Sequence, residues 1–337
     1  FDHKETNWLK ACTLPSGKIY TYKSNFFNRE LISFWDIKEK NTFSFPVDFL
    51  GTSFYLLTCY HERVNYHIKD NHGRFPSSES LLGKHGLLTR PLVNEYVEEI
   101  WQTMIGVFPH ITRVKKEYKL HLSHDVDRPF RYAGVPLIRS LRHAVGEIYR
   151  NFNLKSIFSE AYKYFSVIRG DLTKDPNNTF DYLMHQSEKR GIISNFYFLC
   201  GGNSNYDATY MLSDKEIKFL LGEINYRGHK IGLHGSYNTV KDLRQLECEY
   251  LNLVNTLNDM GVNREKIGGR QHYLRWSASI TWKLWDQLGL TYDASVGYAD
   301  HAGFRTGCCY SYPAFDLDNK AQLSIIVKPL IFMDCTV

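Results

Sequence analysis

The sequence predicts an α/β fold built on a parallel sheet that is either open or closed into a barrel. Two observations predict it: strand-like and helix-like segments alternate from Tyr118 onward, and polar side chains suited to catalysis follow several of the strands. Active sites of such folds lie at the carboxyl ends of the strands. A chain of 337 residues is long enough for two domains. We expect a smaller mixed α/β accessory domain at residues 1–117 and a second domain at 118–337.

The predicted elements follow from periodicity and from start and stop residues. Within the first domain, apolar spacing and early acidic residues predict a helix from Pro91 to Val107. The second domain begins with an alternating strand at 118–124, followed by a basic helical segment, Pro136 to Phe165, within an insertion near 131–176. Later segments repeat a helix–strand order: helices at 179–190, 213–226, 241–260 and 277–288, and strands at 192–199, 230–234, 266–270 and from 292.

Composition and charge exclude several classes of protein. The hydrophobic share of 43% and the charged share of 23% are ordinary for a globular protein. A net charge of +5 without a dense basic stripe or known motif argues against nucleic-acid binding. The seven cysteines are scattered, without a C-x-x-C pair, which favours free thiols in a reducing compartment. With a polar start and no apolar run of membrane-spanning length, we expect a cytoplasmic location without a transmembrane segment.

The segment from Leu122 to Arg128 carries two carboxylates two positions apart. Alternation along a strand places Asp125 and Asp127 on the same side, where a cation is needed to offset their repulsion. One carboxylate can ligate a metal while the other takes a proton from the attacking water. The alternative is structural: an Asp that caps a loop or pairs with Arg128.

A histidine and an asparagine end a later strand. His234 lies between two glycines, which let the backbone approach a ligand closely. Asn238 follows four residues later, where one helical turn would bring its side chain back over His234. Its carbonyl oxygen is a weak metal ligand, and a role as a turn residue is equally compatible with the pattern.

The next strand is followed by an arginine and a histidine. Arg270 can orient a catalytic Asp through a bidentate pair. His272 is a candidate proton donor or substrate contact, and the segment 303–305 extends the polar rim. For Arg270, His272 and the segment 303–305, the alternative is a structural salt bridge away from the catalytic site.

These residues together resemble the NodB-homology polysaccharide deacetylases, carbohydrate esterase family 4, over roughly Leu120 to Val337. Asp125-Val126-Asp127 is similar to the family's first motif, which supplies a base and a metal ligand. Gly228-His229-Lys230-Ile231-Gly232-Leu233-His234 is similar to its second motif, and Arg270 stands where the third motif has its Arg. The resemblance implies a distorted (β/α) barrel, a divalent metal, most often zinc, and removal of N-acetyl groups from sugars.

The sequence departs from the family at three points. Asn238 replaces the second motif's further histidine, proline is missing after Arg270, and no closing Leu-His motif is visible. The metal site is therefore completed by Asn238, or by His124 or His272 in its place. These features suggest a divergent subgroup with an extra N-terminal domain, and such bacterial proteins are associated with surface-polysaccharide biosynthesis.

The resulting hypothesis is a metal-dependent N-deacetylase, or a related hydrolase of C–N amide bonds, acting on an acylated amino sugar or glycan. An alternative is a non-catalytic glycan-binding or assembly protein on a degenerate deacetylase barrel. We expect a carbohydrate partner and no nucleic acid, and the sequence does not fix an oligomeric state. The expected roles are zinc ligation by Asp127, His234 and Asn238, with Asp125 as base, Arg270 orienting it and His272 as acid.

Overall fold

The chain forms two compact units in a computed structural model that describes residues 19–24, 29–33, 47–114, 117–134, 154–262, 266–278 and 280–336. The first unit joins Phe1–Glu117 to Tyr273–Val337, and the second is Tyr118–His272. Contacts within the chain thus group 273–337 with the N-terminal residues, whereas the sequence analysis assigns them to the second domain. That 118–337 folds as one domain stays a prediction.

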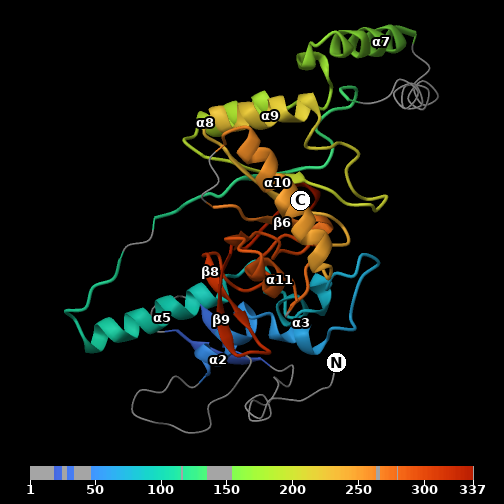
Figure 1. Cartoon of the computed structure of the whole chain (residues 1–337). Helices are drawn as coiled ribbons and strands as arrows, with labels where there is room; N and C mark the ends of the chain where they lie inside the picture. Colours follow the sequence, from blue (N-terminus) through green and yellow to red (C-terminus); the bar gives the residue numbers. More distant parts are fainter. Residues whose placement is uncertain are drawn as a thin grey trace. The chain divides into compact units, whose positions relative to one another are not determined.

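The second unit is built on four parallel strands that neighbour one another in chain order, and the last of them, β6, is labelled in Figure 1. Parallel neighbours need long crossovers, and helices supply them between consecutive strands. The α/β class with a parallel sheet is therefore confirmed, while closure of the sheet into a barrel stays a prediction. The strands are β3 (Ser123–Val126), β4 (Asn195–Leu199), β5 (Lys230–Gly235) and β6 (Gly269–Gln271).

The crossover helices form where the apolar spacing predicts them. The apolar residues of α9 that are buried recur at helical spacing, so one face packs inward while the opposite face is solvated. Gly228 follows α9 with a φ of +75°, a left-handed conformation that glycine adopts at little cost and that turns the chain into β5. The helices are α8 (Phe180–Glu188), α9 (Lys215–Tyr226) and α10 (Leu243–Asp259).

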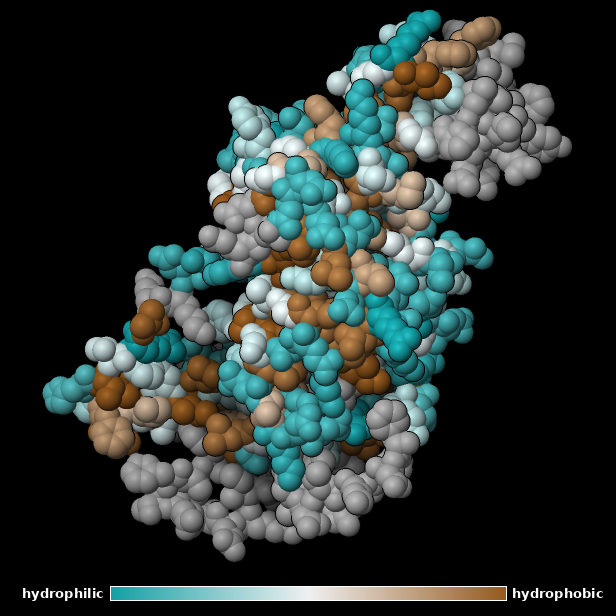
Figure 2. Space-filling model, in the orientation of Figure 1, coloured by the Kyte–Doolittle hydropathy of each residue, from teal (hydrophilic) through white to brown (hydrophobic). Residues whose placement is uncertain are grey.

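The expected insertion near 131–176 is described only in part, because residues 135–153 lie outside the described residues. Its described portion contains helix α7 (Leu154–Ile168) and the short turn η2 (Leu172–Lys174). One face of α7 packs Tyr164 and Val167 against Tyr132. Other side chains of α7 are exposed although they are large and hydrophobic: Phe158, Tyr162, Phe165 and Ile168. Figure 2 shows brown, hydrophobic atoms on the surface at this helix.

The first unit combines a hairpin-like strand pair, a set of helices and a second group of strands. In that second group, β9 runs parallel to β7 and antiparallel to β8. The N-terminal elements are β1 (Tyr20–Lys23), β2 (Glu30–Ser33), α2 (Phe49–Leu57), α3 (Tyr60–Val64), η1 (Ser77–Glu79), α4 (Leu81–Lys84) and α5 (Leu92–Val107). The C-terminal elements are η3 (His272–Leu274), α11 (Thr281–Gln287), β7 (Tyr292–Asp293), β8 (Tyr312–Asp316), β9 (Ala321–Val327) and η4 (Asp334–Thr336).

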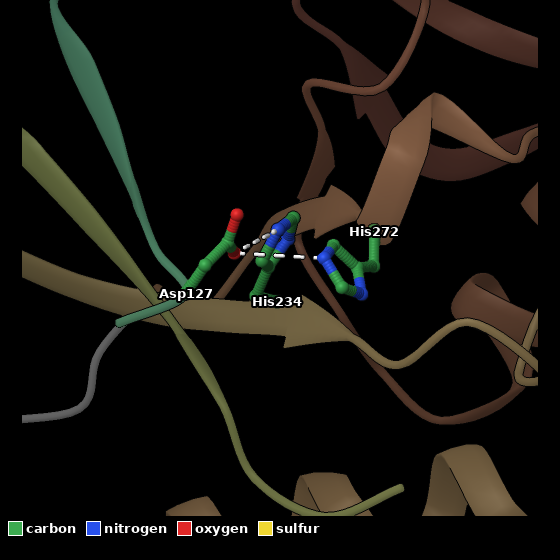
Figure 3. A group of neighbouring side chains, drawn as sticks. All are labelled: Asp127, His234 and His272. Atoms are coloured by element: carbon green, nitrogen blue, oxygen red, sulfur yellow. Dashed lines mark ion pairs between the residues drawn. The ribbon is translucent and has the colours of Figure 1, made fainter. Parts of the chain in front are cut away.

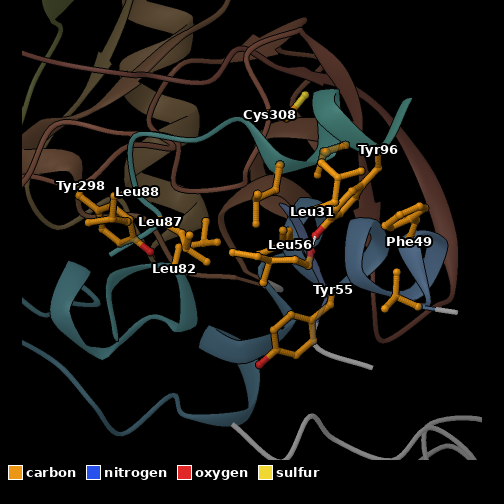
Figure 4. Close-up of a cluster of buried hydrophobic side chains, with 14 of the residues drawn as sticks. Leu31, Phe49, Tyr55, Leu56, Leu82, Leu87, Leu88, Tyr96, Tyr298 and Cys308 are labelled. Atoms are coloured by element: carbon orange, nitrogen blue, oxygen red, sulfur yellow. Dashed lines mark hydrogen bonds between the residues drawn. The ribbon is translucent and has the colours of Figure 1, made fainter. Parts of the chain in front are cut away.

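A hydrophobic core in this unit contains residues from both ends of the chain (Figure 4). The rings of Phe49 and Tyr96 stack at a centroid distance of 4.7 Å. Tyr298 and Cys308 belong to the same buried cluster. The N-terminal and C-terminal segments therefore bury one another's apolar side chains, which is why they form one unit.

A buried ion pair joins the same two segments. Arg305 contacts Glu62 through Nε–Oε1 and Nη2–Oε2 distances of 2.8 and 2.5 Å, and both side chains are 2% exposed. Burial favours the neutral carboxyl, but the charge of Arg305 outweighs it and lowers the pKa of Glu62. Arg305, which the sequence analysis assigns to a polar rim, is thus part of a structural pair in the first unit.

The described residues give two further observations on thiols and on membranes. Six cysteines are free: Cys59, Cys200, Cys248, Cys308, Cys309 and Cys335. Across the described ranges, no helix combines the length and the apolar character that a membrane crossing requires. A cytoplasmic location stays a prediction.

Replacing Glu62 with Gln should destabilise the protein by about 3 to 5 kcal/mol, because Arg305 would remain buried without its counter-charge. Urea denaturation followed by tyrosine and tryptophan fluorescence measures the change. The control is Glu98→Gln, which removes an exposed partner of Arg113 and should change stability by less than about 1 kcal/mol. Equal effects of the two variants would contradict the importance of the buried pair.

Candidate metal and active site

The two carboxylates of the first motif lie at the end of β3. Asp125 is inside the strand, paired in register with Tyr197 of β4, and Asp127 follows the last strand residue. The Asp125 side chain is 17% exposed and that of Asp127 is 50% exposed. Asp127 is therefore the more accessible carboxylate at this edge of the sheet.

Asp127 forms a compact cluster with two histidines (Figure 3). One donor atom from each of Asp127, His234 and His272 lies within 4.8 Å of the other two. Asp127 Oδ1 is 3.4 Å from His234 Nε2 and 3.6 Å from His272 Nε2. His234 comes from β5 and His272 directly follows β6, so three strand ends supply the three side chains.

Hydrogen bonds fix which nitrogen of each imidazole faces the cluster. His234 Nδ1 lies 2.8 Å from the backbone oxygen of Arg270, and a carbonyl only accepts, so Nδ1 carries the proton. His272 Nδ1 lies 3.1 Å from Asp207 Oδ1 and donates to that carboxylate. When both imidazoles are neutral, the two Nε2 atoms carry the lone pairs at the cluster, which is the tautomer that metal-ligating histidines adopt.

This donor set fits a divalent metal ion. One carboxylate and two imidazoles match the nitrogen and oxygen ligands of zinc, and three protein ligands leave a position for water or substrate. The two Nδ1 hydrogen bonds supply the outer support that such ligands usually have. The arrangement is compatible with zinc and with other divalent metals that accept imidazole.

Asp207 connects the cluster to the loops that follow β4 and β5. Its Oδ1 accepts from His272 Nδ1 and from the backbone nitrogen of Tyr237, at 3.1 and 2.8 Å. Its Oδ2 accepts from the backbone nitrogen of Ser204 at 3.0 Å. Burial would raise the pKa of Asp207, but these donors, His272 first, lower it. Asp207 is not among the residues predicted from the sequence, since no local spacing pairs a loop residue with a histidine 65 positions later.

Asp125 is held beside the cluster by Arg270. Arg270 Nη1 donates to Asp125 Oδ1 at 2.8 Å, while Nη2 donates to Ser123 Oγ at 2.7 Å. One bond of the expected pair with Asp125 is therefore present, and a bidentate pair stays a prediction. Asp125 Oδ2 is 3.8 Å from His234 Nε2, so this second oxygen faces the metal-ligand candidates.

The three candidates for the third metal ligand lie in different surroundings. His272 belongs to the cluster. Asn238 is exposed, and its Nδ2 contacts Asn203 Oδ1 at 3.4 Å. His124 stacks on Phe196 with ring centroids 4.8 Å apart, and it is outside the cluster found among the described residues. Ligation by Asn238 stays a prediction, whereas the geometry favours His272.

Comparisons with known proteins assign no function. Residues 4–109 match the model of a family described as a family of unknown function, DUF7033. No curated protein matches the chain. A solved structure described as a "putative polysaccharide deacetylase from Mycobacterium smegmatis" is similar at 14% identity and a TM-score of 0.35. The match covers 62% of this chain and 57% of the other, and a likeness this distant supports no assignment of site or activity.

The charges in the metal-free cluster shift the pKa of His234 and the pKa of Asp127 in opposite directions. Burial opposes the charged form of His234, but the charges of Asp125 and Asp127 outweigh it and raise the pKa of this histidine. Burial also favours neutral Asp127, yet its pairing with His234 and the nearby His272 lower the pKa of this carboxyl. The cluster therefore attracts positive charge, as a cation site must.

We expect His234 of metal-free protein to titrate above its ordinary pKa of about 6.5. Because its folded-state pKa is raised, its stabilising contribution is complete below pH 6.5 and is lost as pH rises through that pKa. Nuclear magnetic resonance of the imidazole signals measures the midpoint. In Asp125→Asn the midpoint should fall, and an unchanged midpoint would show that the Asp125 charge does not act on His234.

Proposed function

We propose that this protein is a metal-dependent hydrolase that removes an acyl group, most simply acetyl, from the nitrogen of an amino sugar. The observation that carries the proposal is the cluster of Asp127, His234 and His272 with Asp125 and Arg270 beside it. The motif resemblance supplies the sugar substrate and the preference for zinc, and it favours a role in making bacterial surface polysaccharides. A bound divalent cation would polarise the acyl carbonyl and lower the pKa of water.

Asp125 is proposed as the general base that takes a proton from the attacking water. Its Oδ1 is occupied by Arg270 Nη1, whereas Oδ2 faces the cluster and can receive the proton. The same carboxyl can then return the proton to the amide nitrogen as the C–N bond breaks. Arg270 holds Asp125 in position through the bond from Nη1 to Oδ1.

We propose a different role for His272 from the acid that the sequence analysis assigns to it. Its Nδ1 is committed to Asp207 and its Nε2 is directed at Asp127, which is the arrangement of a ligand. His272 would then replace the histidine that the second motif lacks at Asn238. The loss of one ligand on the loop after β5 would be compensated by a ligand at the end of β6.

Changing Asp125 to Asn should lower kcat by at least about 100-fold, because the amide cannot take the proton. Metal content should remain near that of the wild type, since Asp125 is not proposed as a ligand. Acetate release from acetylated chito-oligosaccharides and elemental analysis measure the two quantities. Asp127→Asn is the matched control and should lose metal. A parallel loss of metal in Asp125→Asn would contradict the division of roles.

Replacing each candidate for the third ligand in turn should show whether His272 or Asn238 binds the metal. We expect His272→Ala to weaken zinc binding by more than about tenfold in chelator competition, and Asn238→Ala to leave it within about twofold. The reverse order would restore Asn238 as the ligand. If the wild type binds no zinc and releases no acetate, the non-catalytic glycan-binding alternative is favoured instead.

A further inference from the structure

Two tyrosines form a stacked pair on the loops that follow β4 and β5. The ring centroids of Tyr206 and Tyr237 are 4.4 Å apart, and the ring planes differ by 29°. The Tyr206 side chain is 48% exposed, and Tyr237 is partly buried. Because both loops leave the carboxyl ends of parallel strands, the pair lies at the same edge of the sheet as the metal-ligand candidates.

Asp207 ties this pair directly to the metal cluster. It follows Tyr206 in the chain, and its Oδ1 accepts from both Tyr237 N and His272 Nδ1, at 2.8 and 3.1 Å. The backbone nitrogen of Tyr206 also donates to Ser204 Oγ at 3.2 Å, which closes the loop on itself. One carboxylate therefore binds both the Tyr237 backbone and His272, and Tyr206 is its neighbour in the chain.

A fixed pair of this kind suits the face of a sugar ring. Tyrosine offers a flat apolar surface with few rotatable bonds, and its ring face is electron-rich and attracts C–H groups. A pyranose ring presents C–H groups on one face and hydroxyls around its rim. Stacking between Tyr206 and Tyr237 restricts both rings before any ligand arrives, which lowers the entropic cost of binding.

Exposure alone does not distinguish this pair from other surface tyrosines. Tyr226 is 86% exposed, but it ends α9 immediately before β5 begins. It therefore lies at the opposite, amino-terminal edge of the sheet and serves as a matched control. The Tyr206–Tyr237 pair, by contrast, combines exposure of Tyr206, mutual stacking and a hydrogen-bonded link to His272 through Asp207.

We propose that Tyr206 and Tyr237 form a sugar-binding platform, on which a pyranose ring of an N-acetylated amino-sugar oligomer stacks while its acyl group meets the metal cluster. The proposal rests on the proposed function, which it extends from the reacting bond to the recognition of the carbohydrate. Tyr206 supplies the exposed ring, and the ring of Tyr237 stacks against it.

Binding can be tested apart from catalysis in full-length, zinc-supplemented Asp125→Asn protein. Isothermal titration with N,N′,N″-triacetylchitotriose should show that adding Tyr206→Ala weakens affinity about tenfold. Tyr206→Phe keeps the ring and should stay within about twofold, as should the control Tyr226→Ala. Equal affinities with and without Tyr206→Ala, or no binding of the trisaccharide by the parent protein, would overturn the platform.

Kinetics separate this proposal from the proposed function. If acetate is released, Tyr206→Ala in the wild-type background should raise KM for the trisaccharide by a similar factor, with a smaller change in kcat. Acetate release with unchanged KM would overturn the platform while leaving the hydrolase intact. Trisaccharide binding that depends on Tyr206, without acetate release by the wild type, would support the platform and contradict the hydrolase.

Discussion

The candidate site depends on Arg270, which holds an imidazole with its backbone and a carboxylate with its side chain. Its carbonyl oxygen accepts from His234 Nδ1, and its guanidinium donates to Asp125 and Ser123. Arg270 is 3% exposed and lies over the ring of Tyr197 at 5.1 Å. A cation buried to this extent needs a counter-charge, so the position of Asp125 and the stability of β6 are coupled.

The same constraint separates the roles of the two carboxylates. Asp125 has one oxygen committed to Arg270 Nη1 at 2.8 Å, which leaves only the other oxygen to face the cluster. Asp127 lies between two imidazole nitrogens, at 3.4 Å from His234 Nε2 and 3.6 Å from His272 Nε2. A positive ion at this position would satisfy Asp127 in the way that Arg270 satisfies Asp125. Two aspartates two residues apart thus meet different chemical environments, which is what a base and a ligand require.

The sequence predicts those parts of the molecule that depend on local pattern. Helices such as α9 and α10 follow from apolar spacing and stop residues, and strand ends place Asp125, Asp127 and His234 at one edge. The assumed helical turn that would bring Asn238 over His234 is a local rule too, but Asn238 is exposed in the structure. Asp207 and the orientation of His272 depend on a contact between distant loops, which no spacing in the sequence encodes.

The first unit shows why the N-terminal residues cannot be regarded as a detachable addition. Its core contains Tyr298 and Cys308 together with N-terminal side chains, and Glu62 neutralises the buried Arg305. Without residues 1–117, the segment 273–337 would expose that apolar surface and leave Arg305 without its counter-charge. The segment that resembles a deacetylase, Leu120 to Val337, therefore includes a portion whose packing depends on the N-terminal region. This dependence gives the N-terminal region a structural role whatever else it binds.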